Sequence, residues 1–197
     1  MAQPIDDVAL DTIFRTARTF NAYTDHPFTE ADARAIHALV KMGPTSANQQ
    51  PARFVWCLST DAKARLAALS MDSNADKIRA APAAVIVGMD SDFHEHLPDL
   101  FPLTDARSWF TGDADLRAVS AMRNSTLQGA YLIIAARALG WDTGPMSGFD
   151  NAGVDKAFFA DTPNVTSNFI MTIGKGDPRD LFDRSPRPAF DRFNTVV

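Results

Sequence analysis

The sequence of 197 residues is poor in the side chains that form disulfides and metal centres. It contains a single cysteine, Cys57, which excludes an intramolecular disulfide and fits a reducing compartment. Of its four histidines, His94 and His96 stand two apart, and no H-E-x-x-H pattern occurs. Without a ligating cysteine pair, these residues predict packing or surface histidines rather than a metal site.

Long apolar runs and blocks of positive charge are missing as well. The longest apolar run, Tyr131–Ala136, is too short to cross a bilayer. The formal net charge is −5 and no lysine- or arginine-rich block occurs, so nucleic acid and anionic membranes are not expected partners. Met1–Asp11 contains acids and no apolar run, so we expect no secretory signal and a cytoplasmic protein.

The familiar catalytic motifs are mostly missing. Gly144–Gly148 resembles the G-x-S-x-G nucleophile elbow, but its serine stands one position late. Gly174–Gly176 follows an expected strand, but the third fingerprint glycine and a long following helix are missing, and no Walker A motif occurs. These absences disfavour a serine hydrolase, a Rossmann site and a P-loop.

The patterns that are present predict one domain, residues 1–197, of helices and buried strands. A chain of this length with 46% hydrophobic residues can bury about 70% of its unfolded surface. Strands are expected over Phe54–Leu58, Ala83–Met89 and Ser167–Ile173, with an extended, turning piece over Trp141–Phe149. Helices are expected over Asp6–Ala17, from Thr29 to the residue before Gly43, and over Thr60–Ser70, Asn74–Ala80, Asp115–Leu139 and Ala152–Phe159.

Local signals predict how some of these helices begin and end. Thr29 with Asp32 forms a weak capping box, Gly43 is expected at the C′ position, and Thr60 is expected to cap the next helix. The helix Asp115–Leu139 is apolar nearly all round in its second half, so it should be buried on most faces.

Two segments lack a clean period. Asp92–Thr111 mixes aromatics, prolines and Arg107, and is expected to be an irregular excursion that covers a site. The tail from Arg179 carries further arginines among prolines and phenylalanines, without a core face of its own. Such a tail could wrap around a partner.

The stretch Gly43–Phe54 is polar and carries no charge before Arg53. Pro44 and Pro51 stiffen both ends, and the hydroxyls and carboxamides between them both donate and accept hydrogen bonds. Such a loop suits the polar edge of a neutral ring, although a simple helix–strand connection would look similar. Arginines near both chain ends suit a phosphate, so the set is typical of a protein whose cofactor does the chemistry.

Several strings of residues together identify a family. They are Ala17–Asn21, Gly43–Arg53, Asp105–Phe110, Arg123–Ser125, Ala138–Gly140 and Thr143–Asp150. Over essentially the whole chain, the sequence resembles the FMN-dependent nitroreductase superfamily. The motif P-[ST]-S-x-N and the glycine turn are typical of that superfamily. D-A-R-S-W-F and D-T-G-P-M-S-G-F-D resemble the branch of malonic semialdehyde reductases (3-hydroxypropionate dehydrogenases) of pyrimidine breakdown.

The resemblance implies an α+β fold with a mixed central sheet flanked by helices, in an intertwined homodimer with FMN at the interface. Asn21 replaces a basic residue common in the family, and Ser147 replaces a common glutamate, so a preference for NADH or NADPH does not transfer. The implied phosphate and ribityl contacts are Arg18, Thr19, Asn21, Arg184 and Arg187, and the implied isoalloxazine contacts are Pro44, Thr45, Ser46, Asn48, Asn124, Pro145, Met146, Ser147 and Gly148.

The implied reaction passes hydride from NADH or NADPH to flavin N5, and then to malonic semialdehyde to give 3-hydroxypropionate. No side chain is expected to act as a catalytic residue, because the flavin carries the chemistry. Arg107 is expected to bind the substrate carboxylate, since the flavin-facing loops offer no cation and the rival Arg53 enters a strand. Two alternatives stay open: a broad nitro or quinone reductase, and a flavin-binding protein that is not a redox catalyst.

Overall fold

The computed structural model describes residues 3–197, so Met1 and Ala2 lie outside it. Its centre is a four-stranded sheet in the order β1–β2–β4–β3, and all three strand pairs are antiparallel. Within residues 3–197 the only parallel pairing is an isolated bridge between Thr19 and Thr143, so the expectation of a mixed sheet holds only there. The strands are β1 (Ala52–Cys57), β2 (Ala83–Asp90), β3 (Asp142–Met146) and β4 (Val165–Gly174).

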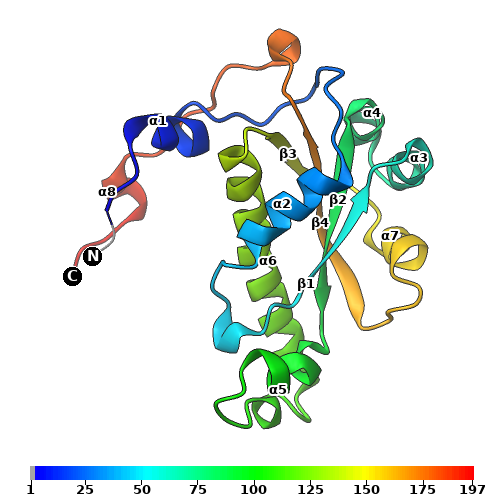
Figure 1. Cartoon of the computed structure of the whole chain (residues 1–197), viewed down its shortest axis with the longest axis vertical. Coiled ribbons are helices and arrows are strands. Elements are labelled where there is room, and N and C mark those ends of the chain that lie inside the picture. The colour runs from blue at the N-terminus through cyan, green and yellow to red at the C-terminus, as the bar shows by residue number, and fades with distance from the viewer. Residues whose placement is uncertain (1–2) are drawn as a thin grey trace.

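Helices cover both faces of this sheet, which confirms the expected α+β arrangement (Figure 1). One face is covered by α2 (Glu30–Val40) and the long α6 (Ala114–Ala138), and the other by α3 (Thr60–Ala68), α4 (Asp72–Ala80) and α7 (Asn151–Phe158). The shorter helices are α1 (Asp7–Leu10), which continues as a π-helical turn over Asp11–Arg15, α5 (Leu97–Leu100) and α8 (Phe190–Phe193).

The two cores follow from the alternation of side chains along the central strands. Val85 and Val87 of β2 point into the cluster under α2 and α6, whereas Ala84 and Ile86 point into the cluster under α3, α4 and α7. Successive side chains of a strand point to opposite faces, so an unbroken apolar run is what a sheet covered on both sides requires.

Two of the expected helix signals need correction. The capping box is confirmed, because Thr29 N–H donates to Asp32 Oδ2 at 2.8 Å and Asp32 N–H donates to Thr29 Oγ1 at 3.3 Å. Gly43 does not adopt the left-handed C′ conformation. Glycine is needed at position 43 for a different reason, because a Cβ there would lie 2.7 Å from the ring of Tyr131. The cap of α3 is Ser59, one residue before the expected Thr60.

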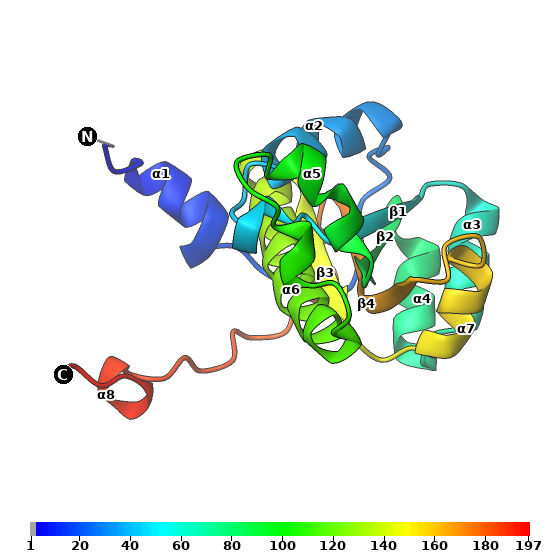
Figure 2. The same ribbon diagram turned by 90° about the horizontal axis from the view of Figure 1, so that it is seen from below.

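The long helix α6 is confirmed, but its burial is not. Leu127 and Tyr131, in its apolar second half, are 46% and 37% exposed, and Leu116, Val119 and Met122 are exposed as well. Beyond the sheet, α1 and the tail that carries α8 project on the same side of the body (Figure 2). No helix within residues 3–197 is long and apolar enough to span a membrane.

Candidate functional site

The loop between α2 and β1 is held in a strained conformation. Ala47, Asn48 and Gln50 have φ angles of 49°, 50° and 43°, in the left-handed region that residues other than glycine rarely adopt. Such a residue costs on the order of 1 kcal/mol or more and persists only where its surroundings fix it. Strain of this kind concentrates at ligand sites, which agrees with the importance that the sequence gives this loop.

A row of polar side chains on α6 fixes the loop. Asn124 Oδ1 accepts the backbone N–H of Ser46 at 2.8 Å, and Gln128 Oε1 accepts the N–H of Ala52 at 2.8 Å. Ser120 completes the row, which repeats every four residues and therefore lies along one face of the helix. Of this row only Asn124 was expected from the sequence, although polar residues four apart in an apolar helix are a visible signal.

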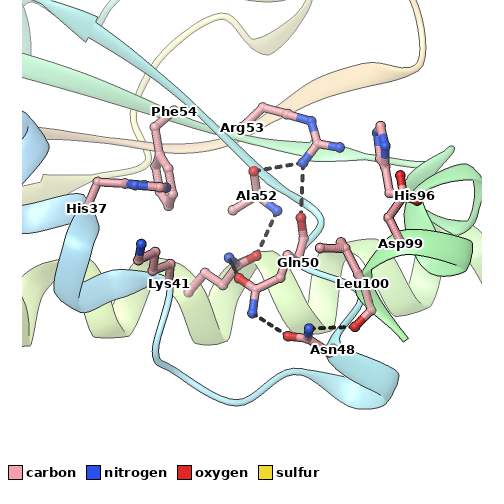
Figure 3. Close-up of a pocket in the computed structure, with 11 residues that line it drawn as sticks. His37, Lys41, Asn48, Gln50, Ala52, Arg53, Phe54, His96, Asp99 and Leu100 are labelled. Atoms are coloured by element: carbon pink, nitrogen blue, oxygen red, sulfur yellow. Dashed lines mark hydrogen bonds between the residues drawn. The ribbon is translucent and has the colours of Figure 1, made fainter. Parts of the chain in front are cut away.

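The carboxamide of Asn48 is committed within the protein. Its Nδ2 donates to the carbonyl of Leu100 at 2.8 Å, and its Oδ1 accepts from Gln50 Nε2 at 3.0 Å (Figure 3). Gln50 Oε1 in turn accepts from Gln128 Nε2 at 2.6 Å. Asn48 therefore joins the loop to α5, and its carboxamide keeps one N–H donor and one acceptor site for a ligand.

A cavity of about 570 Å³ lies beside this loop. In Figure 3, His37 of α2 and Lys41, the residue after α2, lie on one side of it, and His96 and Asp99 lie on the other. Its walls carry positive and negative side chains, and the amides of Asn48, Gln50 and Gln128 already form hydrogen bonds with one another. The lining therefore does not specify one ligand.

The two ends of the chain meet at a second cavity, of about 400 Å³. Four arginines line it, together with hydroxyl and amide groups, and Asp183 is the one acid among the described residues in its wall. All five residues that the resemblance implies for the phosphate end line this cavity: Arg18, Thr19, Asn21, Arg184 and Arg187.

Backbone carbonyls position these arginines but leave donors free. Arg18 donates to the carbonyl of Phe182, and Arg184 Nη2 donates to the carbonyl of Ala17 at 2.9 Å, so each end of the chain holds an arginine of the other. Arg187 Nη1 donates to the carbonyl of Ser185 at 2.8 Å. Because a guanidinium has five N–H donors, each arginine can still bind an anion.

The fourth arginine, Arg137 of α6, was not identified from the sequence. Its Nη1 donates to the carbonyl of Ile13 at 3.1 Å, while its buried Nε has no partner among the described residues. Burial lowers the pKa of Arg137, and the charge of Arg184 lowers it further, against the opposing effect of Asp142. An anion in the cavity would relieve both the unpaired donor and the repulsion between the arginines.

A third cavity, of about 340 Å³, lies beside the end of β3. Thr19 lies in the wall of the arginine cavity and forms a backbone bridge to Thr143. Thr143 precedes Pro145 by two residues, which is about 6–7 Å along a strand. Both cavities thus flank one strand. This third cavity is lined by Pro145, Met146 and Ser147, by Thr126, Ala130 and Ile133 of α6, and by Phe169 of β4.

Two glycines allow this close arrangement. A Cβ on Gly144 would lie 2.6 Å from Thr172 Oγ1 and 2.8 Å from the carbonyl of Phe20, so only glycine lets the N-terminal segment approach β3. Gly148 packs against α4, where Asn74 Nδ2 donates to its carbonyl at 3.0 Å.

These donors fit FMN. Arginines with a hydroxyl and an amide suit a phosphate dianion, and an apolar wall that ends in Ser147 suits a flat ring with a polar edge. A fourth cavity, of about 610 Å³, shares Asn21 and Phe182 with the arginine cavity and adds Lys77. Lys77 was not expected from the sequence, because a lysine on a short helix is usually a solvated side chain.

Within one chain, the expected ring contacts lie in two places. The loop residue Ser46 is held by Asn124, whereas the Pro145–Ser147 turn shares a cavity with Thr126 and Ala130. Residues two apart on a helix point about 200° apart, so the loop and the turn lie against opposite faces of α6.

Arg107 is paired with an acid of its own chain. Its Nε and Nη2 donate to the two carboxylate oxygens of Glu95, each at 2.8 Å, and hydrogen bonds from Arg107 lower the pKa of Glu95. Arg107 lines none of the cavities described above. The segment around it is irregular, as expected, with 3₁₀ turns at Phe93–His96 and Arg107–Trp109.

The structure gives no candidate metal site in the part of the chain that it describes. No set of three or more His, Cys, Asp or Glu side chains among residues 3–197 is placed to hold a metal ion.

Known proteins resemble this chain in sequence and in fold. The model of the nitroreductase family matches residues 5–175. A protein of Xanthomonas oryzae pv. oryzae (strain PXO99A), named as a candidate NADH dehydrogenase/NAD(P)H nitroreductase, is 57% identical over 191 residues, which cover 97% of each chain. A Burkholderia lata protein named in the same way is 58% identical over 187 residues, or 95% of each chain.

Two solved structures share the fold at low identity. A candidate nitroreductase of Exiguobacterium sibiricum, solved in complex with FMN, superposes with a TM-score of 0.85 at 21% identity, over 100% of both chains. The enone reductase CLA-ER superposes with a TM-score of 0.83 at 17% identity, over 98% of this chain and 100% of the other.

Proposed function

The chain belongs to the nitroreductase family, and from that premise we propose that it is an FMN-dependent NAD(P)H oxidoreductase that reduces malonic semialdehyde to 3-hydroxypropionate. The whole chain, residues 1–197, acts as one FMN-binding domain. The observation that carries the proposal is the arginine cavity at the meeting of the two chain ends, beside the apolar cavity of the Pro145–Ser147 turn. A relative in fold holds FMN, and close relatives in sequence are named for NAD(P)H.

The phosphate end is held by Arg18, Arg184 and Arg187, with Thr19 and Asn21 as neutral donors. Charge-assisted hydrogen bonds to phosphate are about twice as strong as neutral ones, so the arginines supply most of the affinity. Arg137, whose Nε has no partner among the described residues, adds positive charge behind them.

The ring end is covered by Pro145, Met146, Ser147 and Gly148. The chemistry that bound FMN supplies is hydride transfer from NAD(P)H to the acceptor, so no side chain has to act as a nucleophile. The apolar walls keep water from the ring, and backbone N–H groups of the turn stabilise negative charge that develops at its polar edge.

The site is completed by a second copy of the chain in a homodimer. The loop contacts lie across α6 from the Pro145–Gly148 turn, so one chain cannot bring both to the same ring. A ring held by the turn of one chain would reach the loop of the other chain, which carries Pro44, Thr45, Ser46, Asn48 and Asn124. The exposed apolar side chains of α6, and Phe190 and Phe193 of the tail, are surfaces that such a dimer would bury.

The acceptor proposal depends on Arg107. The structure joins its segment to the flavin loop, because Asn48 bonds to Leu100 and because Ala47 packs on the apolar cluster that contains Ala106. We infer that, in the dimer, this segment brings Arg107 beside the ring that the partner chain holds, where it can bind the carboxylate of malonic semialdehyde.

A second candidate is a broad nitro or quinone reductase with the same cofactor. The pairing of Arg107 with Glu95 favours it, since a paired guanidinium gives no advantage to an acceptor with a carboxylate. The names of the relatives favour it as well.

The test begins with the absorption spectrum of the purified protein. A flavin spectrum should bleach when NADH or NADPH is added without oxygen. Malonic semialdehyde should restore it faster than uncharged quinones or nitroarenes do. A colourless protein that takes up no FMN would overturn the proposal. Equal rates for all acceptors would favour the second candidate.

A further inference from the structure

Glu95 is an acid surrounded by basic groups. Arg107 binds both of its carboxylate oxygens at 2.8 Å, and His94 Nε2 lies 3.4 Å from its Oε1. The charge of Arg117 also acts on Glu95 and lowers its pKa, after the larger effect of Arg107. The acids near this group are Asp92, 3.9 Å from Arg117 Nε, and Asp105, two residues before Arg107 in the chain.

Two of the surrounding basic groups have unused polar atoms. His94 is 6% exposed and its Nδ1 has no partner, and the buried Nε of Arg117 is also unpartnered among the residues described. Arg117 Nε is thus a donor that no acid among the described residues hydrogen-bonds, since Asp92 Oδ1 lies 3.9 Å away. The group around Glu95 resembles an anion-binding site in which Glu95 takes the place of the anion.

The geometry of the Arg107–Glu95 pair is the one that any carboxylate would adopt. Two parallel N–H···O bonds are the preferred contact of a guanidinium with a carboxylate, whether it belongs to a side chain or to a small acid. The side chains of Arg107 and Glu95 are 47% and 49% exposed, so a small acid can reach the arginine from solvent and Glu95 can turn away without becoming buried.

We propose that Glu95 is an internal competitor for the acceptor's carboxylate and thereby sets the preference between carboxylate-bearing and uncharged acceptors. The inference rests on the proposed function, in which Arg107 binds that carboxylate. A carboxylate acceptor takes over the two hydrogen bonds while Glu95 swings into solvent. An uncharged acceptor cannot replace Glu95 and leaves the pair closed.

The size of the effect follows from the exposure of the pair. Ion pairs exposed to solvent typically change an equilibrium by about two- to fivefold. Since the apparent Kd is the intrinsic Kd divided by the fraction of competent protein, freeing Arg107 should tighten carboxylate binding by about the same factor.

The experiment measures binding rather than turnover. Isothermal titration calorimetry of the oxidised FMN-loaded protein with 3-hydroxypropionate gives Kd for the wild type, Glu95→Gln, Glu95→Ala, Arg107→Ala and the double variant Glu95→Gln/Arg107→Ala. Glu30→Gln is the matched control, because Glu30 is an exposed acid bonded to Arg34 Nε at 2.9 Å, on α2. 1,3-Propanediol, which lacks the carboxylate, is the control ligand.

Both Glu95 variants should lower Kd for 3-hydroxypropionate by about two- to fivefold, and Glu30→Gln should not. Arg107→Ala should raise Kd, and adding Glu95→Gln to it should change nothing further. The inference is overturned if the Glu95 variants fail to tighten binding, or if they tighten it equally without Arg107. If Arg107→Ala leaves Kd unchanged, Arg107 does not bind the carboxylate, and the inference about Glu95 is overturned with it. If FMN does not bind, the proposed function itself fails before any titration.

Discussion

The amide oxygen of Asn124 accepts the backbone N–H of Ser46 at 2.8 Å, so the long helix α6 holds the strained loop that follows α2. Asn124 is 3% exposed, and its Nδ2 donates to the carbonyl of Ser120 at 2.9 Å. The side chain therefore has both of its polar atoms committed inside the protein. This contact connects the stability of the fold with the geometry of the site.

Asn124→Ala should destabilise the protein by about 0.5–1.5 kcal/mol, because it removes the hydrogen bond that Asn124 Oδ1 accepts from the N–H of Ser46. The melting temperature should fall by several degrees, and FMN should bind more weakly as the loop relaxes. Differential scanning calorimetry and flavin titration measure both effects. Arg123→Ala, an exposed neighbour on the same helix, is the control. Equal melting temperatures for the two variants would contradict the argument.

The double variant Arg18→Ala/Arg187→Ala should lose its flavin. The wild type should purify yellow, with about one FMN per chain, because each charge-assisted contact to phosphate contributes about 1.5–3 kcal/mol. The ratio of flavin to protein absorbance after gel filtration measures the loss. Arg192→Ala provides a matched control, since Arg192 lies in the tail but outside the arginine cavity. A double variant that keeps its full flavin content would show that the phosphate lies elsewhere.

The protein should be an obligate dimer whose dissociation releases flavin. Met122→Glu should weaken the dimer, because Met122 is 56% exposed on α6 and a carboxylate there would be buried without a partner. Sedimentation velocity at graded concentrations, followed at a flavin wavelength, measures assembly and cofactor together. An active monomer that retains its flavin would contradict the two-copy site.

Arg107→Ala should raise KM for malonic semialdehyde by roughly tenfold or more, because it removes the cation that binds the carboxylate. Reduction of an uncharged quinone should change much less. Arg34→Ala, which removes an exposed arginine bonded to Glu30, is the control. If both acceptors lose rate equally, Arg107 holds its segment in place. If neither changes, the carboxylate binds elsewhere.

Cys57 should resist thiol reagents in the native protein. It is fully buried, and burial raises the pKa of its thiol to about 11, so little reactive thiolate exists at pH 8. Dithionitrobenzoate should react slowly until a denaturant is added. Because this pKa is raised in the folded protein, the contribution of Cys57 to the free energy of unfolding is fully present below about pH 8.5, the thiol pKa in the unfolded chain. That contribution should be lost as pH rises toward about 11. Fast reaction of the native protein would contradict this burial.

The sequence by itself predicted most of the elements, because helical and strand periodicity and the Thr29–Asp32 box are local. β2 and β4 lie within a few residues of their expected positions for this reason. Through a resemblance that spans both ends, the sequence also indicated three of the four arginines that line the cavity where the chain ends meet.

Tertiary structure alone decided the details on which the site depends. The left-handed residues of the loop follow from bonds to α6, some 80 positions away, and no local pattern encodes them. Leu127 was expected to be buried, but an apolar residue does not reveal whether its cover comes from its own chain or from a partner. The pairing of Arg107 with Glu95 joins two side chains across an irregular segment. Their meeting depends on how the intervening residues pack around Phe93 and Phe110, and periodicity carries no information about such packing.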